Sequence, residues 1–118
     1  MGRAVGRGWD GAFVPGGQRL ARACRERVVR VHHMASLEFF DLVGHSDRVL
    51  SVDWGPDRSR IASGGRDRTV RIWDVAAQAE VMAFELPDEV LAVAWSSDGE
   101  ALAALCRDGS LRLWDAAP

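Results

Sequence analysis

A repeat of 41 residues constrains this chain more strongly than any other feature of its sequence. A shift of that length places residues 85–115 on residues 44–74 without a gap. The same shift places residues 60–72 on residues 19–31, where six of thirteen positions are identical. Repeats of roughly 20–50 residues are typical of proteins whose units cannot bury their apolar faces alone and therefore stack on one another. The sequence thus predicts three copies of one unit, of which the first is degenerate.

Each copy consists of short runs of alternating character separated by turn residues, which is the pattern of antiparallel strands. In the middle copy we expect strands near residues 49–54, 60–64, 69–73 and 80–84. The inner strands carry apolar residues on both faces, and a sheet of that kind has to be covered on both sides. The predicted fold is all-β: three four-stranded antiparallel blades of a partial β-propeller, with the last blade lacking its fourth strand.

Three features together resemble the WD-repeat (WD40) β-propeller family. The copies are 41 residues long, Gly44-His45 precedes the first strand of the middle copy, and Trp73-Asp74 and Trp114-Asp115 close the third strands. In the first copy, His32-His33 replaces the Trp-Asp pair. On this resemblance we expect a flexible tail at residues 1–8, a degenerate repeat at 9–43, a second repeat at 44–84 and an incomplete third repeat at 85–118.

The resemblance also implies a buried hydrogen-bonded tetrad in the middle copy, formed by His45, Ser63, Asp67 and Trp73. Burial of these residues is chemically reasonable, because an indole N–H needs an acceptor and a serine hydroxyl can accept it while donating to an imidazole. The aspartate then holds the imidazole in one tautomer from the other side. Neither of the other copies keeps all four residues, so only the middle copy is expected to contain the network.

The trio of His45, Ser63 and Asp67 also has the residue types of a hydrolytic triad. Ser63 lies in mid-strand beside Gly64-Gly65, without the strand–turn–helix elbow that exposes a nucleophilic serine. The structural interpretation is therefore favoured, and we predict no catalytic residue. We also predict no cofactor, because the sequence has no phosphate-binding glycine loop, zinc-ligand spacing or paired carboxylates. We predict no metal site either, because the adjacent histidines His32-His33 of one strand point to opposite faces.

The cationic side chains suggest an alternative function. All fifteen are arginines; residues 1–37 contain seven of them and two acids, net +5, whereas residues 38–118 contain eight and fifteen acids, net −7. The arginines of residues 19–30 make nucleic-acid binding through the first copy the alternative to protein binding. No aromatic side chains are interleaved there to stack on bases, so we favour a charged blade surface instead.

The main candidates for partner binding are the loops before the first strands and the turns between the second and third strands. The WD40 resemblance places these segments on one face of the propeller, and they contain Asp47, Arg48, Arg66, Arg68, Glu89 and Arg107. Arginine is a frequent anchor of interfaces because its planar fork pairs bidentately and stacks. We therefore predict a non-catalytic scaffold that binds a protein or peptide partner. The sequence has no stretch of about 20 apolar residues, so we expect no membrane association and a cytoplasmic location.

Three blades are fewer than the roughly four to eight with which propellers close. The sequence leaves three outcomes open. The chain is a portion of a larger propeller, or it completes a ring by self-association with copies of itself, or it is a decayed remnant that folds poorly.

Overall fold

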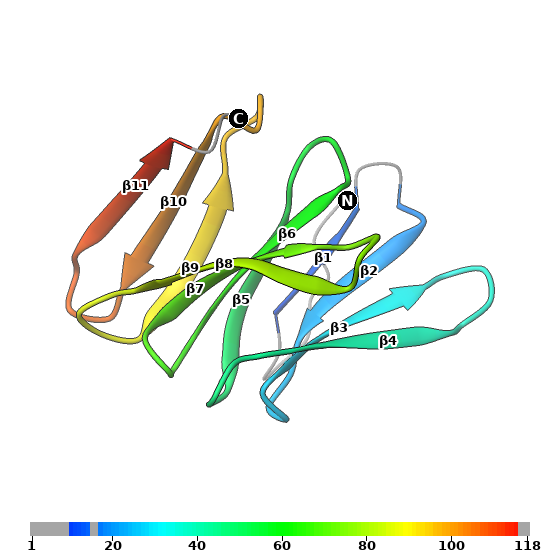
Figure 1. The fold of residues 1–118 in the computed structure, drawn as a ribbon, viewed down its shortest axis with the longest axis horizontal. Helices are drawn as coiled ribbons and strands as arrows, with labels where there is room; N and C mark the ends of the chain where they lie inside the picture. The colour runs from blue at the N-terminus through cyan, green and yellow to red at the C-terminus, as the bar shows by residue number, and fades with distance from the viewer. Residues whose placement is uncertain (1–9, 15–16, 116–118) are drawn as a thin grey trace.

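The computed structural model describes residues 10–14 and 17–115, which form three antiparallel sheets in chain order (Figure 1). The first sheet contains β1 (Asp10–Phe13), β2 (Arg19–Ala23), β3 (Val28–His33) and β4 (Phe39–Val43). The second contains β5 (Val49–Trp54), β6 (Arg60–Gly65), β7 (Thr69–Asp74) and β8 (Ala79–Glu85). The third contains β9 (Val90–Trp95), β10 (Ala101–Cys106) and β11 (Leu111–Asp115). The predicted all-β fold of a partial propeller is confirmed, whereas the tail expected at residues 1–8 lies outside the described residues.

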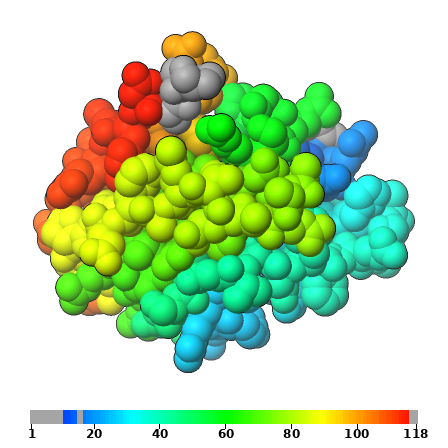
Figure 2. All heavy atoms as spheres, viewed as in Figure 1, coloured from blue at the N-terminus to red at the C-terminus, as the bar shows by residue number. Residues whose placement is uncertain are grey.

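The three sheets stack face to face, so that strands of the same rank are neighbours in space. β1 packs beside β5, and β5 beside β9, whereas β4 and β8 run side by side on the face seen in Figure 2. Equivalent tryptophans join the sheets. Nε1 of Trp54 donates to the carbonyl of Ala12 at 2.9 Å, and Nε1 of Trp95 donates to the carbonyl of Asp53 at 3.2 Å. The two tryptophans are 41 residues apart in the sequence, and so are the two residues that accept from them. The contact between sheets therefore repeats with the same period as the sequence.

Two apolar clusters fill the spaces between the sheets. Between the first and second sheets, the buried residues include Ala21, Val29, Val31, Val52, Trp54 and Ile61. Between the second and third sheets, they include Ala62, Val70, Ile72, Val90, Val93 and Leu102. Each large apolar side chain that is fully buried contributes about 1.5–3 kcal/mol relative to exposure. The second sheet contributes to both clusters, which explains why its inner strands are apolar on both faces.

The hairpin turns repeat along with the strands. In the turn after each second strand, the same place is taken by a residue with positive φ: Arg27 at 72°, Arg68 at 67° and Gly109 at 89°. This left-handed conformation costs a residue other than glycine about 1–3 kcal/mol. Neighbouring aspartates help to hold the turns, since Asp67 and Asp108 each accept a hydrogen bond from the backbone N–H two residues further on, at 3.2 Å and 2.9 Å.

One apolar face of the third sheet is not covered by any described residue. We call it the open face; it consists of Ala92, Ala94, Ala103, Leu105, Leu111 and Leu113. Its three leucines are 41%, 60% and 70% exposed. The residues one repeat earlier, Gly64, Val70 and Ile72, are all buried beneath the third sheet. The equivalent faces of the first and second sheets are thus each covered by the next sheet, whereas the open face of the third sheet is exposed.

Gly64 allows the second and third sheets to approach closely. A Cβ atom added at Gly64 would overlap Cγ1 of Val90 and lie 2.9 Å from its Cβ. Contacts this short do not occur between packed side chains, so only glycine fits without a shift of β9. One repeat later, the same place is taken by Leu105, whose side chain finds room because it points from the open face.

We expect Gly64→Ala to lower the free energy of unfolding by about 1–3 kcal/mol, the usual effect of overpacking a core. Urea denaturation followed by tryptophan fluorescence measures this change. Gly55→Ala is the matched control, because a Cβ there would lie 3.4 Å from its nearest neighbour, the carbonyl oxygen of Arg60. Equal stability of the two variants would contradict the close packing of β9 on the second sheet.

Candidate functional site

The structure brings the four residues of the predicted tetrad together in the second sheet. Ser63 on β6 lies between Trp73 on β7 and His45 in the connection from β4 to β5; Asp67 lies in the turn from β6 to β7. The indole N–H of Trp73 donates to Oγ of Ser63 at 2.8 Å, and this Oγ is 2.7 Å from Nε2 of His45. On the other side of the ring, Nδ1 of His45 is 2.9 Å from Oδ2 of Asp67. The four side chains therefore form one continuous chain of hydrogen bonds.

Only one arrangement of protons satisfies every member of this chain. Because Trp73 can only donate, Ser63 accepts its proton and donates its own hydroxyl proton to Nε2 of His45. Nδ1 then carries the proton of the neutral imidazole and donates it to Asp67. All four polar groups are paired, and the described residues contain no buried side-chain nitrogen or oxygen without a partner.

Burial sets the protonation of the network. It lowers the pKa of His45, against the opposing influence of the Asp67 carboxylate and its hydrogen bond. Burial alone would raise the pKa of Asp67. The nearby His45 ring, together with hydrogen bonds from Thr69, from His45 and from the backbone of Ser46, outweighs burial and holds the pKa of Asp67 below its ordinary value. A neutral histidine and an ionised aspartate are thus the stable pair.

Three further residues extend the network outward, and the sequence analysis missed them. Thr69 donates its hydroxyl proton to Oδ1 of Asp67 at 2.8 Å and accepts from Nε of Arg71 at 3.1 Å. Arg71 in turn donates to Oε1 of Glu80 on β8 at 2.6 Å. A signal was available for Arg71, because the 41-residue shift places it on Arg30 and Arg112. Thr69 and Glu80 have no identical counterpart at that spacing.

The other sheets replace the tetrad with different contacts. In the third sheet, Leu86 and Ala104 stand in the places of the histidine and serine, and Trp114 stacks on Phe84 of β8 in the second sheet, with ring centroids 4.9 Å apart. In the first sheet, Arg30 makes a bidentate ion pair with Asp41 at 2.8 Å and 3.1 Å. The first and second sheets thus each join their third and fourth strands by an arginine–carboxylate pair, whereas the ring contact joins the third sheet to β8 of the second.

Ser63 has no access to solvent. Its exposure is 0%, and its single hydroxyl is engaged by both Trp73 and His45. A nucleophilic serine needs a substrate carbonyl within reach, and no such approach exists here. The adjacent histidines of β3 also have separate surroundings: His32 lies against the ring of Phe39, with centroids 5.7 Å apart, and His33 accepts from the backbone of Ser36. In the described part of the chain, no three potential ligands gather in a way that could hold a metal ion.

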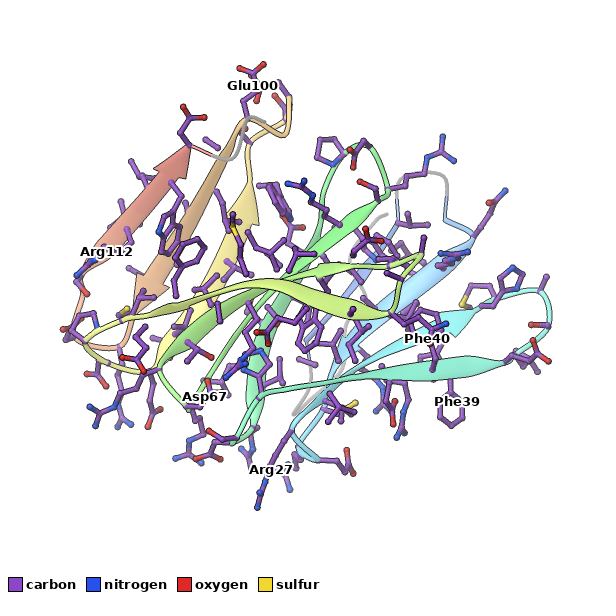
Figure 3. All side chains as sticks on the ribbon, in the orientation of Figure 1. Arg27, Phe39, Phe40, Asp67, Glu100 and Arg112 are labelled. Carbon is purple, nitrogen blue, oxygen red and sulfur yellow. The ribbon has the colours of Figure 1, made fainter. Side chains whose placement is uncertain are left out.

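The residues predicted to bind a partner lie along one edge of the stacked sheets. We call this edge the turn face and define it as residues 24–27, 44–48, 66–68, 86–89 and 107–109. It contains all six predicted residues: Asp47, Arg48, Arg66, Arg68, Glu89 and Arg107. In Figure 3, Arg27 and Asp67 mark this edge, whereas Glu100 lies at the opposite end of the sheets.

Backbone hydrogen bonds hold the parts of the turn face together. The carbonyl of Arg48 accepts from the N–H of Arg66 at 2.9 Å, and the carbonyl of Glu89 accepts from the N–H of Arg107 at 2.8 Å. The carboxylate of Glu89 also lies 3.6 Å from the guanidinium groups of both Arg66 and Arg107. Three of the six predicted residues are therefore brought into one ion cluster. The sequence analysis missed Arg25 and Arg27, although the repeat places them on Arg66 and Arg68.

We expect the free energy of unfolding to decrease as the pH falls below about 6.5, the ordinary pKa of histidine. The folded state lowers the pKa of His45, so the unfolded chain binds more protons in this range, and stability is lost as the pH decreases. The double variant H45L/S63A copies Leu86 and Ala104 of the third sheet. Its unfolding free energy should depend less steeply on pH, as measured by urea denaturation between about pH 5 and 7.

The control for this comparison is His33→Gln, because His33 is exposed and outside the tetrad. Some dependence on pH should remain in every variant, since burial and the charges of Arg22 and Arg30 also lower the pKa of His32. An equal slope in H45L/S63A and the parent chain would contradict the assigned role of His45.

In the part of the chain that the structure describes, no helix is long and apolar enough to cross a membrane.

Comparison with known proteins agrees with this geometry. A search of curated proteins gives no match. A family model described as "WD domain, G-beta repeat" matches residues 37–74 and 81–115, leaving β1 to β3 outside the match. Because these segments span more than half of the chain, the resemblance seen in the sequence is confirmed, and the chain belongs to the WD40 family.

Proposed function

We propose that this chain is a non-catalytic scaffold that binds a protein or peptide partner through its turn face and works as part of a larger propeller. WD40 repeats generally mediate protein–protein interactions as scaffolds. The observation that carries the proposal is the contrast between buried and exposed polar residues in the second sheet. Its polar network is buried and fully paired, whereas the exposed arginines Arg66 and Arg68 project beside it on the turn face.

The non-catalytic role is supported by what the tetrad does in the fold. Ser63 accepts a hydrogen bond from the indole of Trp73 and donates one to the imidazole of His45. Without this serine, each of the two buried rings would have a polar group without a partner, which is unfavourable. Trp73, at 1% exposure, is the largest side chain buried to this extent among the described residues. The serine therefore links the third strand of the sheet to the second, and its hydroxyl group is fully engaged by these two hydrogen bonds.

We expect Ser63→Ala to lower the free energy of unfolding by about 1–3 kcal/mol, because the buried Trp73 N–H and His45 ring lose a partner. Thermal melting by circular dichroism measures the loss. Ser97→Ala, at an exposed turn position, should melt like the parent chain. A hydrolytic enzyme would behave in the reverse way: esterase activity toward p-nitrophenyl acetate would be present in the parent chain and vanish in Ser63→Ala without a change in melting.

The membership in a larger propeller is supported by the open face. The equivalent faces of the first and second sheets are each buried by the next sheet of the same fold. By the same pattern, a further WD-type sheet would cover the open face. That further sheet would need an apolar face of the kind with which the third sheet covers the second. In the third sheet this face includes Val90, Val93 and Leu102. Burying Leu111 and Leu113 in this way would contribute about 1.5–3 kcal/mol each.

The outer face of the first sheet is a poor match for the open face. Residues that alternate with those facing the second sheet point outward here, and they include Arg22, Arg30, His32 and Asp41. Docking a second copy head to tail would bury Arg22 against leucines, and a buried charge without a partner is strongly unfavourable. A further WD sheet with an apolar face is therefore favoured over ring closure by two copies.

We expect the isolated chain to associate at micromolar concentration through its open face, as measured by sedimentation velocity. The double variant L111E/L113E should sediment as a monomer and melt like the parent chain, because both leucines are largely exposed. The matched control is Arg22→Glu, which should associate like the parent chain; a loss of association in this variant would instead indicate head-to-tail ring closure. A parent chain that stays monomeric at every concentration would contradict the proposal.

A further inference from the structure

The contact between neighbouring turns is repeated along the turn face, and one of its two copies lacks a carboxylate. Between the second and third sheets, the carboxylate of Glu89 lies between the guanidinium groups of Arg66 and Arg107, 3.6 Å from each. Glu89 is partly buried, with a side-chain exposure of 23%. The acidic residue is thus held between two arginines that come from successive sheets.

Between the first and second sheets, the same places are all taken by arginine. The 41-residue shift places Arg25 and Arg66 on Arg66 and Arg107, and it places Arg48 on Glu89. Within each sheet the loop and the turn are joined in the same way, because the N–H of Arg66 donates to the carbonyl of Arg48 at 2.9 Å just as that of Arg107 donates to the carbonyl of Glu89 at 2.8 Å. The N–H of Val49, next to Arg48, also donates to the carbonyl of Cys24, next to Arg25, at 3.3 Å.

Positive charge therefore accumulates on this part of the turn face. Five arginines lie in its three segments: Arg25, Arg27, Arg48, Arg66 and Arg68. The exposed acids of the same segments are Glu26 and Asp47, since Asp67 is engaged by His45. In the part of the chain that the structure describes, no acidic side chain lies within ion-pair distance of Arg25, Arg27, Arg48 or Arg68.

We propose that the turns of the first and second sheets bind an acidic peptide segment, one of whose carboxylates takes the place between Arg25, Arg48 and Arg66 that Glu89 takes between Arg66 and Arg107. This inference rests on the proposed function, because it names the partner of the same turn face. Guanidinium groups pair strongly with carboxylates, and charge complementarity selects such a partner and speeds its association. The chain itself shows the geometry in which its arginines accept an acidic side chain.

An acidic peptide fits this surface better than a nucleic acid does. The three segments of the first two sheets contain one ring-bearing side chain, His45, which is buried and hydrogen-bonded on both of its nitrogens. Binding of single-stranded nucleic acid relies on exposed aromatic rings that stack on the bases. Peptide carboxylates need no such platform, only guanidinium groups within reach.

The test uses the whole chain and a fluorescein-labelled peptide of eight glutamates, with binding followed by fluorescence anisotropy. The parent chain should bind this peptide, bind a peptide of eight glutamines far more weakly, and lose affinity as salt is added. Arg48→Glu supplies an internal carboxylate at the place of Glu89, and it should weaken binding by about tenfold or more. Its melting temperature should not fall, because the new carboxylate forms the ion pairs already seen at Glu89.

Arg58→Glu is the matched control. Arg58 is exposed in the turn between β5 and β6, at the opposite end of the sheets, and the variant changes the net charge of the chain by the same amount. It should bind the glutamate peptide within about twofold of the parent affinity. Equal weakening by both variants would show that only the net charge matters, and unchanged binding by Arg48→Glu would show that the peptide lies elsewhere; either result overturns the proposal.

Two further measurements separate this inference from its alternatives. A labelled octauridine RNA that binds more tightly than the glutamate peptide, and loses affinity in Arg48→Glu, would overturn the peptide assignment in favour of nucleic acid. Selection of random peptides displayed on phage then tests the underlying function. Binders without acidic residues that are lost in the variant R66A/R68A would overturn the acidic partner alone, whereas an absence of binders that depend on the turn face would overturn the scaffold function as well.

Discussion

The whole structure depends on the coverage of the second sheet on both of its faces. Isolated sheets of three or four short strands have little stability in water unless one apolar face is buried, and this sheet has two. Ile61 packs toward the first sheet and Val70 toward the third, both with no exposed surface. The tryptophans of β5 and β9 then fix the spacing by donating to the sheet before their own. Strand order, turn position and the location of the turn face all follow from this stacking.

The polar network of the second sheet adds selectivity to that apolar packing. A buried indole, hydroxyl and imidazole are unfavourable unless each finds its partner, so the network specifies one register between β6 and β7 and one path for the preceding loop. The first and third sheets lack it: the first has an ion pair between β3 and β4, and β11 of the third sheet stacks its tryptophan on a phenylalanine of β8 in the second. A degenerate repeat can therefore keep its fold while its polar residues diverge.

Much of this architecture could be predicted because the period of 41 residues assigns each residue a rank within its sheet. That rank identified the strands, and the resemblance to the WD40 family then supplied the tetrad and the common face of the turns. It did not identify Thr69 and Glu80, which join the network through side-chain reach rather than through repetition. It also did not reveal that Arg22 and Arg30 point away from the second sheet, since alternation within a strand separates two faces without stating which of them is covered.

The pair of Gly64 and Leu105 has a consequence for how such a chain can be rearranged. The two residues occupy the same place in successive units, yet one is the smallest side chain and the other among the larger apolar ones. If the unit that contains Leu105 took the place of the second unit beneath β9, its leucine would lie where Val90 leaves no room even for a Cβ atom. The two units therefore share a backbone fold but differ in the size of the side chain that their place in the stack allows.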